Sequence, residues 1–103
     1  MTLSKVRFQA KGKQIFGAHF QTKIGDYYGQ NQIYDRTRPF TYDGDEPKIL
    51  AGTDLRANPL EYILVALNGR LSTALIYNAY ARGIYLDEVE STLGGDFDTR
   101  GII

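Results

Sequence analysis

The chain has no cysteine, only one histidine and no excess of charge of either sign among its 103 residues. Without cysteine, the protein can form neither a disulfide framework nor a zinc or iron–sulfur site built on thiolates. His19 alone cannot supply a histidine-based metal site, and it gives no basis for a Ser/His/Asp triad. We therefore expect no metal and no cofactor, and the sequence points to no catalytic residue.

The balanced charge also excludes classes of partner. Twelve basic residues stand against twelve acidic ones, and neither sign forms a block. A nucleic-acid backbone or an anionic membrane selects for a basic patch, so we expect neither as a partner. The N-terminal residues lack the apolar stretch of a secretory signal, and no glycine-rich phosphate-binding motif occurs. The expected location is the cytoplasm.

A long helix is predicted over residues 59–82, because both of its ends have local signals. Asn58 suits the N-cap, Pro59 suits the first helical position, and Glu61 stands where a capping box places its acidic residue. Gly83 follows as the residue that can adopt the left-handed conformation at a helix end.

Apolar residues cover most of this predicted helix. They are Leu60, Ile63, Leu64, Val65, Ala66, Leu67, Leu71, Ala74, Leu75, Ile76, Ala79 and Ala81. A helix that is apolar nearly all round is typical of one enclosed by protein, so we expect a long buried central helix. Arg70 stands in the middle of this helix and is the exception to its apolar character.

The rest of the chain indicates antiparallel strands and an α+β fold. Alternation of apolar and polar residues predicts a hairpin over residues 4–21, with its turn at residues 11–13. Residues 24–31 indicate a loop or a bulged strand start, and residues 43–47 a turn. Residues 38–42 indicate a short edge strand, because Pro39 excludes them from the centre of a sheet. A further strand is predicted over residues 86–93, after the helix. His19, on a strand, is expected to be a satisfied surface or interface residue.

Three stretches of the sequence resemble the signature region of the OsmC/Ohr family. These are Gly52-Thr53-Asp54, the segment from Asn58-Pro59-Leu60-Glu61 through the helix to Ile84, and Gly95-Asp96-Phe97-Asp98-Thr99-Arg100-Gly101. The resemblance spans residues 43–101. It implies one OsmC-like domain over residues 1–103, which corresponds to about the first two-thirds of the usual family fold.

The resemblance also implies one departure from the family and one shared property. The helix of family members contains the peroxidatic cysteine that reduces organic hydroperoxides, and Arg70 occupies the matching position here. Without a thiol that reaction is impossible for this chain. Family members form intertwined dimers with sites at the subunit boundary. We therefore expect a homodimer, or a hetero-oligomer with a chain that completes the fold.

Four residues are candidates for ligand binding. Arg70 has the planar cation that grips carboxylates or phosphates, and Tyr77 lies two turns away on the same side of the helix. The position that matches the site glutamate of the family is Leu60 in this chain. The next residue, Glu61, lies about 180° around the helix from Arg70, which fits a role in capping the helix. Arg38 is the counterpart of the family's site arginine, although its spacing to Asn58 differs. The alternative for Arg36 and Arg38 is two solvated loop charges.

Three hypotheses for the function remain open. The protein binds a small hydrophobic or anionic molecule near Arg70 at a subunit interface, which is the hypothesis we prefer. Alternatively, it is a cysteine-independent enzyme that uses Arg, Tyr and carboxylate groups for acid–base chemistry. In the third hypothesis it is a structural subunit of a hetero-oligomer, and Arg70 is paired with a carboxylate that only holds the subunit boundary.

Overall fold

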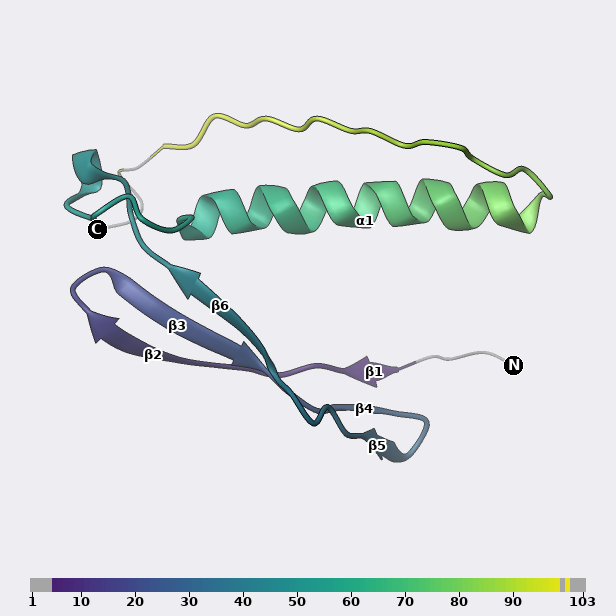
Figure 1. The fold of residues 1–103 in the computed structure, drawn as a ribbon, viewed down its shortest axis with the longest axis horizontal. Coiled ribbons are helices and arrows are strands. Elements are labelled where there is room, and N and C mark those ends of the chain that lie inside the picture. The colour runs from purple at the N-terminus through teal and green to yellow at the C-terminus, as the bar shows by residue number, and fades with distance from the viewer. Residues whose placement is uncertain (1–4, 99, 101–103) are drawn as a thin grey trace. The chain divides into compact units, whose positions relative to one another are not determined.

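The computed structural model of the chain describes residues 5–98 and 100. They divide into two compact units, one ending at Asn58 and the other beginning at Pro59. The described part of the first unit contains six strands and a short 3-10 helix, and that of the second contains one long α-helix followed by extended chain (Figure 1). The fold is α+β, with antiparallel strands preceding a long helix, as the sequence predicts.

The larger sheet consists of β2 (Ala10–Phe16), β3 (His19–Ile24) and β6 (Phe40–Gly44), in the order β2-β3-β6. Both pairings are antiparallel. β6 is an edge strand, which confirms the prediction made from residues 38–42. Pro39 lies just before its first residue, where a missing backbone N–H removes no hydrogen bond from the ladder.

The predicted turn at residues 11–13 is wrong, because β2 runs straight through it and Gly12 pairs with Thr22 of β3. The chain instead reverses at Gly17 and Ala18, the two residues that follow Phe16. Gly17 has a φ of +58°. Gly12 has a packing role within the strand. A Cβ atom there would lie 2.2 Å from Cε1 of Phe20, so the Phe20 ring occupies the space of the missing side chain.

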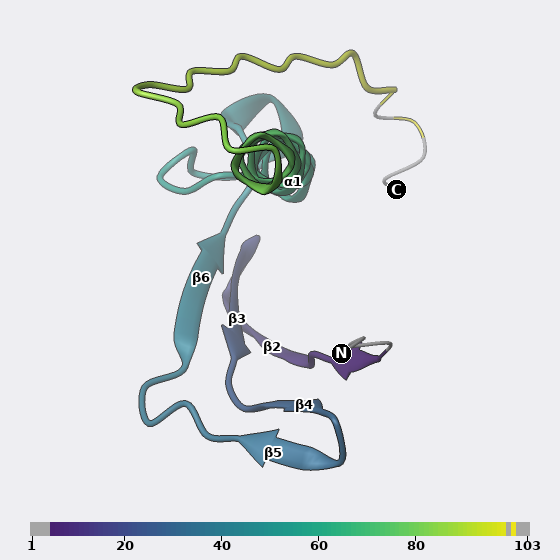
Figure 2. The same ribbon diagram turned by 90° about the vertical axis from the view of Figure 1, so that its right-hand side faces the viewer.

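The smaller sheet consists of β1 (Val6–Arg7), β4 (Tyr27–Gly29) and β5 (Gln32–Tyr34), in the order β1-β4-β5 (Figure 2). Residues 24–31, predicted as a loop or a bulged strand start, therefore include the regular strand β4. Gln30 and Asn31 join β4 to β5 with φ angles of 52° and 60°. Two consecutive positive φ angles are typical of the type I′ turn, whose twist matches that of the paired strands.

After β6 the chain enters η1 (Lys48–Leu50) and then α1 (Pro59–Ala81). The end of α1 is a Schellman motif, in which Gly83 has a φ of +74°. The N–H of Gly83 donates to the carbonyl of Tyr80 at 3.0 Å, and the N–H of Ile84 donates to that of Ala79 at 2.9 Å. The predicted bounds of the helix are therefore confirmed to within one residue.

Within this one chain, none of the residues of α1 is buried, so the expected burial of the helix depends on the association with another chain that the sequence also predicts. Within the described part of its unit, only an extended segment accompanies α1. That segment runs back along the helix, and Ser91 holds it there: its hydroxyl donates to Oδ1 of Asn68 at 2.7 Å and lies 2.9 Å from Oγ of Ser72 (Figure 1). One extended segment cannot cover a helix on all sides.

The strand predicted over residues 86–93 is also wrong, since residues 84–98 form no strand. A β-strand needs a neighbouring strand to receive its backbone hydrogen bonds, and this segment lies beside a helix. Parts of two other predictions lie outside the described residues: Ser4 of the predicted hairpin, and Thr99 and Gly101 of the C-terminal motif.

Candidate functional site

Arg70 lies near the middle of α1 with its side chain exposed. Within residues 5–98 and 100, its guanidinium forms no ion pair. Tyr77, seven residues later, is 70% exposed and lies on the same side of the helix. The helix therefore presents one cation and one aromatic hydroxyl together, next to exposed apolar side chains.

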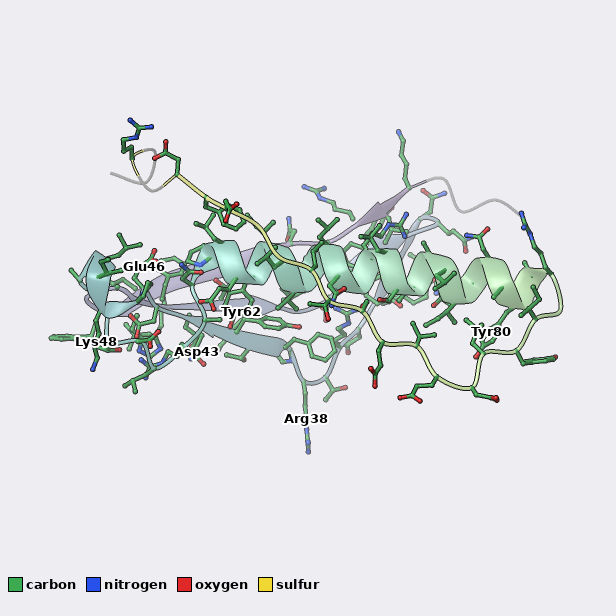
Figure 3. All side chains as sticks on the ribbon, turned by 90° about the horizontal axis from the view of Figure 1, so that it is seen from above. Arg38, Asp43, Glu46, Lys48, Tyr62 and Tyr80 are labelled. Carbon is green, nitrogen blue, oxygen red and sulfur yellow. The ribbon has the colours of Figure 1, made fainter. Side chains whose placement is uncertain are left out.

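The other two predicted residues do not join this pair. Glu61 is nine residues before Arg70, which places it on the opposite side of α1. Arg38 belongs to the first unit, on the exposed loop between β5 and β6, and Figure 3 shows its side chain extending outward from that loop. Of the four candidates, α1 brings together only Arg70 and Tyr77.

Arg36 is a packed residue, so its interpretation as a solvated loop charge is wrong. Its Cζ atom lies 4.7 Å from the ring centroid of Tyr27 and 4.9 Å from that of Phe40. Its backbone N–H donates to Oδ1 of Asp26 at 2.8 Å, and its Nη1 donates to the carbonyl of Gly25 at 3.4 Å. Cation–π contacts at this distance stabilise the packing, so Arg36 connects the β4–β5 hairpin to β6.

Asp45 is the organising residue of the loop before α1, and sequence reasoning missed it. Only 2% of its surface is exposed. Its carboxylate accepts a hydrogen bond from the Thr53 hydroxyl, two from the backbone N–H groups of Glu46 (2.8 Å) and Thr53 (3.3 Å), and one from Nη1 of Arg56 at 3.5 Å. The hydrogen bond from the Thr53 hydroxyl, followed by that from Glu46, holds the pKa of Asp45 well below its usual value.

Backbone N–H groups of this loop also form hydrogen bonds. The N–H of Asp45 donates to the carbonyl of Ala57 at 3.1 Å, and the N–H of Asp54 donates to that of Glu46 at 3.0 Å. Asn58, which is 8% exposed, donates from its side-chain amide to Oε1 of Glu46 at 3.3 Å. Because the Asp45 carboxylate bonds only to its own loop, we assign it a structural role: it shapes the chain just before α1. Figure 3 labels Glu46 and Lys48 in this region.

The one histidine is hydrogen-bonded, in accord with its interpretation as a satisfied residue. Nε2 of His19 lies 2.8 Å from Oδ1 of Asp43, and Nε2 of Gln21 donates to the same oxygen at 3.2 Å. The hydrogen bond from His19, followed by that from Gln21, lowers the pKa of Asp43. An ionised carboxylate only accepts hydrogen bonds, so the Nε2–H of His19 is the donor.

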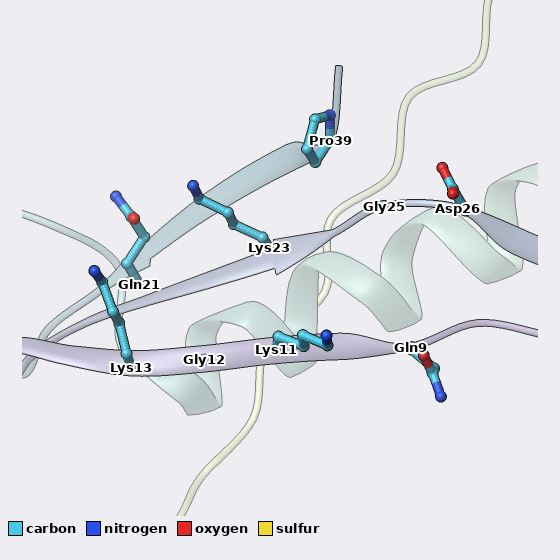
Figure 4. Close-up of a pocket in the computed structure, with 9 residues that line it drawn as sticks. All are labelled: Gln9, Lys11, Gly12, Lys13, Gln21, Lys23, Gly25, Asp26 and Pro39. Atoms are coloured by element: carbon cyan, nitrogen blue, oxygen red, sulfur yellow. The ribbon is translucent and has the colours of Figure 1, made fainter. Parts of the chain in front are cut away.

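A hollow of about 500 Å³ lies over β2 and β3, and none of the four predicted ligand-binding residues lines it (Figure 4). Within the described part of the chain, no three His, Asp or Glu side chains gather closely enough to hold a metal ion. The same residues include no helix that is long and apolar enough to cross a bilayer.

No protein-family model matches the chain, and no curated protein matches it either. The resemblance to the OsmC/Ohr family therefore stays a prediction from the residues quoted above.

Proposed function

We propose that this chain is a cysteine-free member of the OsmC/Ohr family that binds a small hydrophobic or anionic molecule beside Arg70, at a boundary between subunits. The observation that most supports a ligand site is the exposure of Arg70 and its lack of an ion pair among the described residues. This cation lies on a helix whose apolar side chains are also exposed.

The exposed apolar surface of α1 supports the subunit boundary. Seven large side chains of this helix have between 45% and 70% of their surface exposed: Ile63, Val65, Leu67, Leu71, Leu75, Tyr77 and Tyr80. Soluble proteins rarely leave so large an apolar patch in water, and such patches typically mark a contact with another molecule. A second subunit, identical or different, would remove this surface from water.

Covering α1 would also remove water from Arg70. A guanidinium enclosed without an anion loses several kcal/mol of solvation, on the order of 3–5 kcal/mol, so the assembled protein must supply an anion or admit one. Arginine binds planar carboxylates and phosphates through two parallel hydrogen bonds. Together with the apolar neighbours, this favours a ligand that combines an acidic group with an apolar body.

Two alternative functions are also consistent with an exposed Arg70 on an apolar helix. In a structural subunit, a carboxylate of the neighbouring chain would pair with Arg70 and no ligand would bind. In an enzyme without cysteine, Tyr77 or a carboxylate would transfer a proton next to a carbonyl held by Arg70. The structural alternative predicts that Arg70 stabilises the empty protein. The ligand-binding proposal and the enzyme alternative both predict that Arg70 stabilises the protein only when a ligand is bound.

Melting curves of Arg70→Met test this difference. We use decanoate as the probe, because it has a carboxylate and an apolar chain. In the ligand-site hypothesis, Arg70→Met leaves the empty protein equally stable or more stable and abolishes stabilisation by decanoate. Arg82→Met, which removes an exposed arginine just after α1, serves as the matched control and should keep that stabilisation.

The opposite result identifies a structural pair. If Arg70→Met lowers the stability of the empty protein by about 3–5 kcal/mol, a buried carboxylate has lost its partner and the ligand-site hypothesis is wrong. A wild-type protein that neither decanoate nor other acidic amphiphiles stabilise would likewise contradict the proposal.

A further inference from the structure

One face of the β2-β3-β6 sheet is basic. Lys11 and Lys13 alternate along β2, so both side chains project from the same face. Lys23 of β3 lies directly opposite Lys11 in the antiparallel register. Side chains in such a pair are neighbours on one face, and two like charges in these positions destabilise the sheet. The three lysines, which we call the lysine cluster, therefore repel one another in the free protein.

Two carboxylates, Asp43 and Asp26, lie near the three lysines, so the positive charge is only partly balanced. None of the three ammonium groups forms an ion pair with a described residue. Asp43, on the same face, already accepts hydrogen bonds from His19 and Gln21. Asp26, near the end of β3, accepts one from the backbone of Arg36 at 2.8 Å. A local excess of positive charge remains, although the chain as a whole is neutral.

The lysine cluster lines a hollow of about 500 Å³, shown in Figure 4. This volume falls in the range of small-molecule sites, which is about 300–1,000 Å³. Gln9 and Gln21 line the same hollow and add amide groups, and Asp26 adds a carboxylate near the end of β3. The hollow thus combines several cations with neutral donors and acceptors, all within the first unit of the chain.

We propose that this hollow binds a small molecule bearing two or more phosphate groups. Three ammonium groups around one space fit a ligand with several negative charges, and lysine binds phosphate oxygens as a point charge. Asp26 would accept a hydrogen bond from a hydroxyl or amino group of the same ligand. A nucleic acid is disfavoured, because a neutral chain lacks the broad positive field that a long phosphate backbone selects.

This site shares no residue with the one proposed at Arg70. The two proposals therefore succeed or fail independently. Arg70→Met should leave binding at the lysine cluster unchanged, and substitutions in the lysine cluster should leave the response to decanoate unchanged.

Calorimetric titration of the full chain with tripolyphosphate at low ionic strength tests the proposal. We expect saturable binding that weakens steeply with added salt, as phosphate contacts do. Lys11→Gln and Lys23→Gln should each weaken binding by about fivefold, and the double variant by more. Lys48→Gln, which removes an exposed lysine of η1 outside the hollow, serves as the matched control and should bind as the wild type does.

Melting curves without a probe provide a second test. Lys11→Gln and Lys23→Gln should each raise the melting temperature, because each removes one member of a repelling pair, while both reduce the shift that tripolyphosphate produces. The proposal is wrong if tripolyphosphate does not bind, if Lys48→Gln weakens binding as much as Lys11→Gln, or if sulfate at equal ionic strength stabilises the protein equally well. Binding of a single-stranded oligonucleotide without binding of tripolyphosphate would identify a nucleic-acid surface and overturn the small-molecule assignment.

Discussion

Thr53 binds Asp45 through two groups: its hydroxyl and its backbone N–H both donate to the carboxylate that lies eight residues earlier in the chain. A carboxylate that is 2% exposed needs such donors, since burial without them would disfavour its charge. The pair closes the loop between β6 and α1. The contact thus shapes the part of the chain that leads to α1.

The pH dependence of stability should reveal this contact. The pKa of Asp45 lies below its ordinary value of 3.8, so the folded state favours the ionised form. Its contribution to stability is therefore complete above pH 3.8 and is lost as the pH falls through the lower folded-state pKa. Asp45→Asn should reduce stability at neutral pH and flatten the loss of stability below pH 3.8, as urea denaturation at several pH values can measure.

Asp96→Asn is the matched control for this substitution. Asp96 is exposed and lies outside the loop, so its replacement should leave stability at neutral pH unchanged. If Asp45→Asn behaves like this control, the Asp45 carboxylate does not hold the loop.

A second prediction concerns the close approach of Gly52 to Glu46. A Cβ atom at position 52 would lie 1.9 Å from the backbone oxygen of Glu46, which cannot rotate away as a side chain can. Gly52→Ala should therefore cost about 1–3 kcal/mol or more in the free energy of unfolding. Gly94→Ala is the matched control, because nothing lies within 4 Å of its added Cβ. Equal stability of the two variants in chemical denaturation would contradict the loop geometry.

The parts of the fold that sequence reasoning predicted have local causes. The bounds of α1 follow from Asn58-Pro59 at one end and Gly83 at the other, residues whose effect on the backbone extends over only one turn. The parts that it missed have distant causes. The turn expected at residues 11–13 is replaced by a strand that pairs with β3, and the Phe20 ring of β3 fills the space at Gly12.

The same reason explains two further failures, at residues 86–93 and at Asp45. The apolar pattern of residues 86–93 resembles that of a strand, but a strand forms only where a partner strand is available. Asp45 stood within a predicted turn without any sign of burial, and its donors Thr53 and Arg56 are eight and eleven residues away in irregular chain. No periodic pattern links residues of a loop, so only the structure brings them together.

The absence of cysteine leads to a chemical prediction. Purified protein should not turn over cumene hydroperoxide or tert-butyl hydroperoxide with any dithiol reductant, because the thiolate that attacks the peroxide is missing. A coupled assay of reductant consumption, run with a metal chelator, measures this directly. Consumption of peroxide that depends on the protein and survives chelation would contradict it.

The exposed surface of α1 leads to a prediction about assembly. Light scattering at micromolar concentration should show a species larger than one chain. Leu75→Glu should shift it toward the monomer, because Leu75 is 56% exposed and a charge there would be buried on association. Ile49→Glu, at a residue of η1 that is 90% exposed, is the matched control outside α1 and should leave the assembly intact. A compact wild-type monomer that unfolds cooperatively would contradict this prediction.

Native mass spectrometry of the wild type and of Arg70→Met, each incubated with decanoate, tests the central claim most directly. It weighs the assembly and any small molecule bound to it in the same spectrum. The proposed function predicts an assembly of two or more chains that retains decanoate in the wild type, and the same assembly without decanoate in Arg70→Met. A wild-type monomer, or equal retention of decanoate by both proteins, would contradict a ligand site at Arg70 on a subunit boundary.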